Sequence, residues 1–222
     1  MKKPNFACML MSVAAIILLT TGCVSFRGKE LPAIDDFTVL VGVDGKPSAS
    51  YSFSATIGSE AVLEGERINL EQEFAGALRE SGYFAAVTPH REGDLDVRAH
   101  LAVSGDSADV IPAALSFVSL GMIPSWATDR YEVVVTVTAR TGGEYIYRLS
   151  DTTTTVRWLP MIILVPFKKP DEVARLVRMN IWRTLVIRMQ EDGLLPTSGP
   201  VSPGAVHQAG VAPHAVNLRN TL

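Results

Sequence analysis

Residues 69–104 read NLEQEFAGALRESGYFAAVTPHREGDLDVRAHLAVS, and this stretch holds the two patterns that decide the fold. Asn69 precedes Gln72 by three residues, a capping-box arrangement that predicts the start of a helix at Asn69. Ser81-Gly82 predicts its end, because glycine readily adopts the left-handed cap. From Leu95 to Ser104 apolar and polar residues alternate, which indicates a half-buried strand. The apolar face of the expected helix comprises Leu70, Phe74, Ala77 and Leu78.

The alternating pattern recurs on both sides of this stretch. In residues 51–57, apolar residues alternate with serines and a threonine. We expect this segment to form a hairpin with a strand over 37–43. Residues 131–139 and 145–149 alternate on either side of Gly142-Gly143, a composition typical of a tight hairpin turn. These segments predict a predominantly antiparallel or mixed sheet.

A second helix is predicted from Asp171 to Gly193, since apolar residues recur there at helical spacing. Its apolar face comprises Val173, Leu176, Val177, Ile181, Leu185 and Met189. The arginines in its middle are interpreted as a solvated face, with a contact to anionic lipid or an acidic partner as the alternative. Thr152–Thr155 are expected on an exposed or edge face. Together the elements predict an α+β fold, with a sheet of about five to six strands and two helices packed on one face.

The N-terminus, residues 1–23, reads MKKPNFACMLMSVAAIILLTTGC. A basic start and a short apolar run from Phe6 to Leu19 are typical of a secretory signal and too short for a comfortable membrane span. Gly22-Cys23 resembles the lipobox of bacterial lipoproteins, although Thr20 stands where the usual box has leucine. The resemblance implies cleavage before Cys23 and acylation of its thiol, with palmitate as the expected type of chain. An ordinary secretory signal cut nearby and an uncleaved anchor are the alternatives.

These boundaries predict a signal peptide at 1–22, a lipidated tether at 23–32, a periplasmic α+β domain at 33–195 and a disordered C-terminal tail at 196–222. In lipoproteins of diderm bacteria, the residue after the cysteine influences sorting between the two membranes. Val24 is not the aspartate that commonly retains lipoproteins at the inner membrane. The expected location is therefore the inner leaflet of the outer membrane, facing the periplasm.

Composition excludes several classes of function. The chain has 20 basic and 23 acidic residues, whereas a nucleic-acid partner requires a strongly basic face. Its only cysteines are Cys8, inside the signal, and Cys23, so the exported part has no disulfide. With no further cysteine and four scattered histidines, a zinc cluster is not expected. We predict no metal and no cofactor.

Two uncharged stretches are the candidate contact surfaces. Residues 110–127 read VIPAALSFVSLGMIPSWA and residues 158–167 read WLPMIILVPF. Prolines interrupt both, so neither is expected to span a membrane as one helix. We expect part of them to be exposed for a protein partner or lipid. The residues proposed for this contact are Leu115, Phe117, Leu120, Met122, Ile123, Trp126, Trp158, Met161, Ile162, Ile163, Leu164 and Phe167.

Catalytic motifs are missing from the sequence. It contains no phosphate loop, no GxGxxG after a strand, no GxSxG elbow, no SxxK and no HExxH. His100 is interpreted as a surface histidine, because neither an acid nor a nucleophile is evident beside it. The serines of 50–54 likewise show no accompanying base. A hydrolase would need a cleft that brings together at least two of the following residues: Asp94, Asp96, His100, Asp106 and Asp151. We call these five residues the hydrolase set.

Residues 71–103 resemble small periplasmic lipoproteins of the TolB N-terminal, LpoB and PelC type. The matching positions are Leu78, Ser81-Gly82, Phe84, Val87 and Asp94. The resemblance implies a domain that binds a protein partner or assembles into a ring at the outer membrane, and it transfers no functional residues.

The sequence thus predicts a non-catalytic lipoprotein, bound to the membrane through its N-terminal lipid, that docks a protein partner or self-assembles in envelope assembly or transport. A carrier of lipid or another hydrophobic ligand is the alternative, and an envelope hydrolase is a third, weaker hypothesis.

Overall fold

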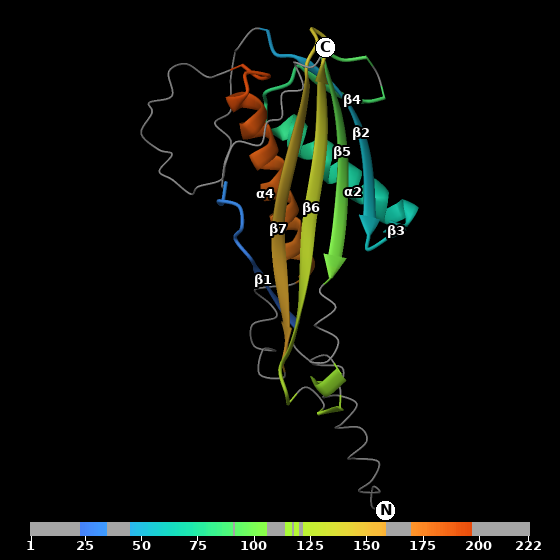
Figure 1. Cartoon of the computed structure of the whole chain (residues 1–222), viewed down its shortest axis with the longest axis vertical. Helices are drawn as coiled ribbons and strands as arrows, with labels where there is room; N and C mark the ends of the chain where they lie inside the picture. Colours follow the sequence, from blue (N-terminus) through green and yellow to red (C-terminus); the bar gives the residue numbers. More distant parts are fainter. Residues whose placement is uncertain are drawn as a thin grey trace, which may run out of the picture. The chain divides into compact units, whose positions relative to one another are not determined.

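The computed structural model describes residues 23–34, 45–90, 92–105, 114–116, 118–119, 122–158 and 170–196 (Figure 1). Its elements are β1 (Cys23–Arg27), β2 (Ser48–Ile57), β3 (Glu60–Ala61), α2 (Glu64–Glu80), β4 (Ala86–Pro89), β5 (Leu95–Gly105), β6 (Ser125–Ala139), β7 (Glu144–Arg157) and α4 (Pro170–Glu191). The chain divides into two compact units. Unit 1 comprises the described residues within 1–29, 104–130 and 151–177, and unit 2 those within 30–103, 131–150 and 178–222.

The strands form a seven-stranded mixed sheet in the order β1-β7-β6-β5-β2-β3, with β4 paired to β2. Strand β2 runs parallel to β5 and β4 and antiparallel to β3, while β1 is antiparallel to β7. The α+β class and the mixed sheet confirm the prediction. The sheet exceeds the expected strand number because β1, β3 and β4 are too short to show a periodic pattern.

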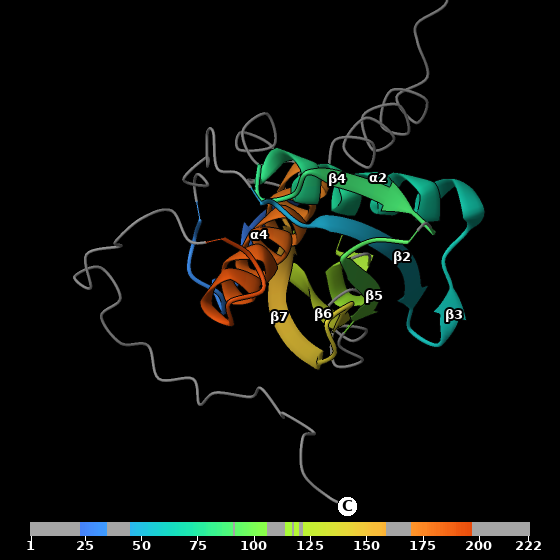
Figure 2. The same cartoon turned by 90° about the horizontal axis from the view of Figure 1, so that it is seen from above.

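The core of unit 2 is built around aromatic rings. Phe74 of α2 is fully buried, and its ring centroid lies 4.9 Å from Trp182 of α4 and 5.8 Å from Phe53 of β2. Tyr51, also on β2, meets Phe74 edge-on at 6.0 Å. Both helices therefore pack on the same face of β2, as predicted (Figure 2).

Helix α2 corrects one predicted boundary. It starts at Glu64 rather than Asn69, and Leu63 precedes it without a side-chain capping bond. Arg67 forms ion pairs with both Glu64 and Glu71, each at 2.7 Å, so charge pairs support the turns before Asn69. The predicted end is confirmed, with Ser81 at the C-cap followed by Gly82 at φ 70°.

Helix α4 confirms the second predicted helix with one difference in its apolar face. Val177, Ile181, Leu185 and Met189 are fully buried, but Leu176 is 62% exposed. Three of the arginines expected on a solvated face, Arg178, Arg183 and Arg188, are half-buried. Arg178 donates to both oxygens of Glu73 at 2.8 and 3.0 Å. Burial acts to lower the pKa of Arg178, and the Glu73 carboxylate outweighs it, so the net shift is upward.

The expected tether is partly folded. Residues 23–27 form β1, whose pairing with β7 runs from Cys23 opposite Arg157 to Arg27 opposite Thr153. Because β1 covers this edge, β7 is an inner strand. Thr152 and Thr153 are consequently buried, which contradicts the exposed or edge face expected for these threonines.

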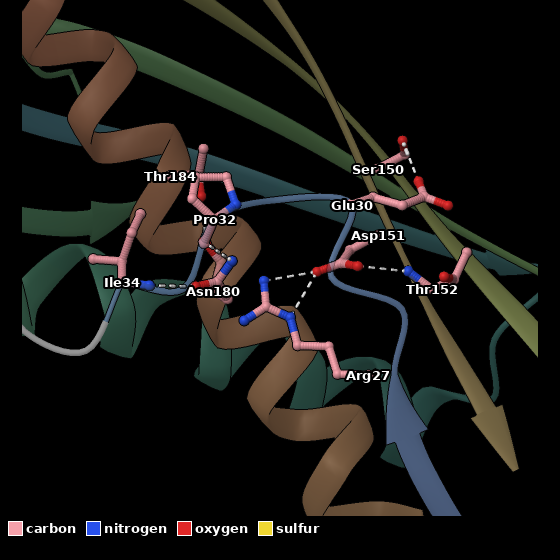
Figure 3. A network of polar contacts seen from close by, with 9 residues as sticks. All are labelled: Arg27, Glu30, Pro32, Ile34, Ser150, Asp151, Thr152, Asn180 and Thr184. Atoms are coloured by element: carbon pink, nitrogen blue, oxygen red, sulfur yellow. Dashed lines mark hydrogen bonds and ion pairs between the residues drawn. The ribbon is translucent and has the colours of Figure 1, made fainter. Parts of the chain in front are cut away.

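In unit 2, residues 32–34 are held against α4 by hydrogen bonds. Asn180 is buried, accepts a hydrogen bond from Ile34 N and donates one to Pro32 O, both at 2.9 Å (Figure 3). Arg183 donates to Ile34 O at 2.7 Å. One asparagine thus satisfies a donor and an acceptor of an irregular backbone segment.

Several predictions fall outside the described residues. They include the signal peptide at 1–22, the strand over 37–43, most of the uncharged stretch 158–167, the tail beyond 196 and the placement of Asp106.

Candidate functional site

A polar face of the sheet in unit 2 is the first candidate site. The parallel register of β2 and β5 sets Ser50 opposite Asp96, Ser52 opposite Arg98 and Ser54 opposite His100. The alternation that buries Tyr51, Phe53 and Ala55 under the helices turns these polar residues to the other face. Two polar faces predicted separately from sequence are therefore one surface.

An open groove of about 720 Å³ lies on this face. Its lining comprises Ser50, Tyr51, Ser52, His90, Glu92, Gly93, Asp96, Arg98, Thr138, Ala139 and Arg140. Gly93 forms part of the wall, and a Cβ at this position would lie 2.6 Å from Ser50 N. The close approach of these backbones therefore requires glycine.

Charges of both signs line the groove. Asp96 accepts from Ser50 Oγ at 3.1 Å and from Arg98 Nε at 2.8 Å. Glu92 and Arg140 add one charge of each sign. Such a lining offers hydrogen-bond donors and acceptors to a polar surface and has no apolar enclosure for a hydrophobic ligand.

Asp94 forms its hydrogen bonds with Ser48, outside the groove. Its carboxylate accepts from Ser48 N at 2.9 Å and Ser48 Oγ at 2.7 Å, and its own N–H donates to Ser48 Oγ. These hydrogen bonds, first from the backbone and then from the hydroxyl, lower the pKa of Asp94. Asp94 thus joins the start of β5 to the start of β2 through Ser48. It does not line the groove.

His100 has a nucleophile beside it, contrary to the interpretation from sequence. His100 Nδ1 and Ser54 Oγ lie 2.9 Å apart, and both line a second open groove of about 330 Å³. A serine hydrogen-bonded to an imidazole is the start of a nucleophilic site. Within the described part of the chain, no acidic side chain bonds to His100, so the third member of a triad is not in place.

The described members of the hydrolase set do not lie together in one groove. Asp96 lines the larger groove, His100 lines the smaller one, and Asp94 lines neither. Asp151 belongs to unit 1, where it is fully buried beside Arg27. Asp106 lies outside the described residues.

The apolar contact candidates lie in unit 1. Leu115, Met122, Ile123 and Trp126 are 52%, 68%, 46% and 49% exposed, which confirms that part of the first uncharged stretch is uncovered in the isolated chain. Trp158 is half-buried and donates from its indole N–H to Met122 O at 3.2 Å. The remaining candidates lie outside the described residues: Phe117, Leu120, Met161, Ile162, Ile163, Leu164 and Phe167. Val118, which is not among the predicted contact residues, is 81% exposed.

Cys23 is a free, partly exposed thiol at the first position of β1. The next two residues, Val24 and Ser25, are buried, and Ser25 Oγ lies 2.6 Å from Thr155 Oγ1. The proposed acylation site is thus joined to the folded chain without an intervening flexible residue.

The described residues hold no group of three His, Cys, Asp or Glu side chains that could bind a metal ion. Among the same residues, no helix has the length and apolar character needed to cross a bilayer.

Comparisons with known proteins give distant likenesses only. No family model matches the chain, and no curated protein is significantly similar to it. Among solved structures, a minor lipoprotein from Acinetobacter baumannii is 12% identical with a TM-score of 0.36, over 68% of this chain and 96% of that one. A PelC dodecamer from Paraburkholderia phytofirmans is 10% identical with a TM-score of 0.25, over 71% and 97%. A homolog of neuraminyllactose-binding hemagglutinin from Helicobacter pylori is 10% identical with a TM-score of 0.35, over 65% and 81%. At these scores the likenesses carry no argument about function.

Proposed function

We propose that the protein is a bacterial lipoprotein anchored through Cys23, and that its folded part docks a protein partner or a second copy without catalysing a reaction. The observation that carries the proposal is the burial of Val24 and Ser25, the two residues after Cys23, in a strand that pairs Cys23 with Arg157. Cleavage immediately before Cys23 keeps both of these buried residues in the mature chain. A cut a few residues later would remove a strand that holds two buried residues, Val24 and Ser25.

The groove of unit 2 is the surface we assign to the docked protein. Its serines and threonine, together with charges of both signs, match the polar composition of protein surfaces that associate reversibly. The groove is open and lies on the face of β2 away from α2, so a partner can reach it without rearrangement of the helices. The same openness and polarity weigh against the hydrophobic-ligand carrier, which needs an enclosed apolar cavity.

The anchor is tested by the intact mass of protein purified from the cell envelope. The wild-type chain should begin at Cys23 and carry acyl mass, whereas Cys23→Ser should carry none and remain a full-length precursor. A Cys23→Ser chain that is processed like the wild type would refute acylation at this residue.

Docking is tested by photo-crosslinking in the envelope from position 52. A crosslinking residue in place of Ser52 lies in the groove, and one in place of Glu66 lies on the exposed face of α2 as the control. We expect an adduct from position 52 alone, and its mass separates a partner from a second copy. Equal labelling from both positions, or none from either, would contradict the assignment.

Ser54 and His100 favour a second candidate, an envelope hydrolase. A fluorophosphonate probe, which reacts with activated serines, tests it directly. Labelling that is lost in Ser54→Ala but kept in Ser52→Ala would support the hydrolase and replace the non-catalytic proposal.

A further inference from the structure

Unit 1 exposes an apolar segment, which comprises the described residues 114–116, 118–119 and 122–126. Its exposed apolar side chains in the described part are Leu115, Val118, Met122, Ile123 and Trp126. The sequence from 110 to 127 contains no charged residue. Several neighbouring apolar side chains open to solvent carry a cost that a soluble protein normally avoids.

Hydrogen bonds hold this exposed arrangement in place. Ser119 N donates to Leu115 O at 3.0 Å, and Met122 N donates to Ser119 O at 3.1 Å. The Ser119 hydroxyl donates to Ser116 O at 3.1 Å and accepts from Ile123 N at 3.0 Å. The segment thus satisfies these polar groups internally, which is the condition for placing a backbone in lipid.

Two contacts tie the segment to the strand that pairs with the anchor residue. Trp158 donates to Met122 O at 3.2 Å, and Trp158 directly follows Arg157, the residue opposite Cys23. Met122 O is therefore bonded to the residue that directly follows the strand partner of Cys23. Thr128 Oγ1, two residues after Trp126, also lies 3.3 Å from Thr154 Oγ1 on the same strand.

The residues around this contact suit a membrane surface. Tryptophans concentrate at the boundary between lipid tails and headgroups. Trp126 belongs to the apolar segment, and Trp158 is bonded to it. Arg157 is exposed directly opposite Cys23, where a cation can meet lipid phosphate. The acyl chains expected on Cys23 would hold all of these groups at one leaflet.

We propose that the apolar segment inserts into the lipid leaflet that holds the acyl chains of Cys23. The inference rests on the proposed function for the anchor. Acyl chains alone hold the protein at the membrane, while insertion of the apolar segment orients unit 1 against it. A lipid leaflet is favoured over a protein partner because the anchor residue and the segment are linked through Arg157 and Trp158.

The test places a fluorophore in the segment. Cys8 and Cys23 are the only cysteines, so Met122→Cys gives the acylated mature chain a single reactive thiol. The control is Leu63→Cys, at an 81% exposed leucine of unit 2. Each is labelled with an environment-sensitive dye and reconstituted in vesicles of phosphatidylethanolamine and phosphatidylglycerol, with or without brominated acyl chains.

We expect a blue shift of the emission at position 122 and quenching by the brominated chains, with neither change at position 63. A blue shift without bromine quenching would instead indicate a second copy and overturn the proposal. Equal emission at both positions would overturn it as well.

A second way of holding the protein on vesicles tests lipid contact by the segment independently of acylation at Cys23. Mature Cys23→Ser protein carrying Met122→Cys can be held on vesicles by an N-terminal histidine tag and nickel-chelating lipid. If wild-type Cys23 proves unacylated but position 122 is still quenched in the tagged protein, the proposed anchor fails and lipid contact by the segment stands. If Cys23 is acylated and position 122 is not quenched, only the segment's contact fails.

Discussion

Arg27 and Asp151 form a buried ion pair in unit 1. Both Nε and Nη2 of Arg27 lie 2.9 Å from Asp151 Oδ2, and the Asp151 side chain is completely inaccessible to solvent (Figure 3). Asp151 Oδ1 also accepts from Thr152 N at 2.9 Å. The pair joins the last residue of β1 to β7, so the strand that begins with Cys23 depends on it.

We expect Arg27→Ala to lower the free energy of unfolding by about 3–5 kcal/mol, because it leaves a buried carboxylate without its guanidinium. Urea denaturation followed by circular dichroism measures the loss. The matched control is Arg98→Ala, which breaks the exposed pair with Asp96 and should cost at most about 1 kcal/mol. Similar losses in both variants would contradict a special role for the buried pair.

Asn180→Ala should destabilise unit 2 by about 1–3 kcal/mol for each backbone group left unsatisfied. Asn180 accepts from Ile34 N and donates to Pro32 O, and alanine can do neither. Hydrogen exchange should show faster exchange at the Ile34 amide. Asn69→Ala removes an exposed asparagine of α2 and serves as the control, with no change expected at Ile34.

Two substitutions in the aromatic core should differ strongly. Phe74→Ala removes a fully buried ring and should cost about 3–5 kcal/mol in thermal or urea unfolding. Trp182→Phe keeps most of the contact with Phe74 and removes an indole N–H that has no hydrogen-bond partner among the described residues. Its cost should be well below that of Phe74→Ala, and a cost as large would contradict the prediction.

Tyr147 should make stability fall at alkaline pH. Burial first, and then its hydrogen bond to the Asp192 carboxylate at 2.8 Å, raise the pKa of Tyr147 well above the usual value near 10. The neutral phenol is favoured in the fold. Its contribution is therefore complete below the unfolded pKa and is lost as the pH rises through the folded pKa.

The measurement compares the free energy of unfolding of wild type and Tyr147→Phe across the alkaline range. The wild type should lose stability relative to the variant above about pH 10, where the unfolded tyrosine ionises. Tyr145→Phe is the control and should retain the alkaline loss due to Tyr147. A difference between wild type and Tyr147→Phe that stays constant with pH would contradict the prediction.

Local patterns predicted the regular elements well. The alternation from Leu95 to Ser104, the hairpin at Gly142-Gly143 and the helix from about 171 to 193 all reappear in the structure, because each depends on residues near one another in the chain. The predicted start of α2 was wrong because ion pairs of Arg67 stabilise its first turns. The prediction rested only on a capping side chain.

Pairings between distant segments were not predictable in the same way. Ser54 and His100 are 46 positions apart and meet only because β2 and β5 are parallel and in that register. The burial of Thr152 and Thr153 likewise depends on β1 covering β7. A one-residue shift in either register would turn every side chain of the strand to the other face.

The sequence by itself determined the α+β class and the uncharged stretch in unit 1, and it left Cys23 as the single cysteine after residue 22, since these follow from residue identity and short-range periodicity. Only the tertiary structure decided that Cys23 lies in a strand, that Asp151 is buried against Arg27 and that the serines of β2 meet charged residues of β5 in a groove. The physical reason is that strand pairing joins residues far apart in the chain. Local preferences determine which face a side chain takes, whereas packing determines what lies against that face.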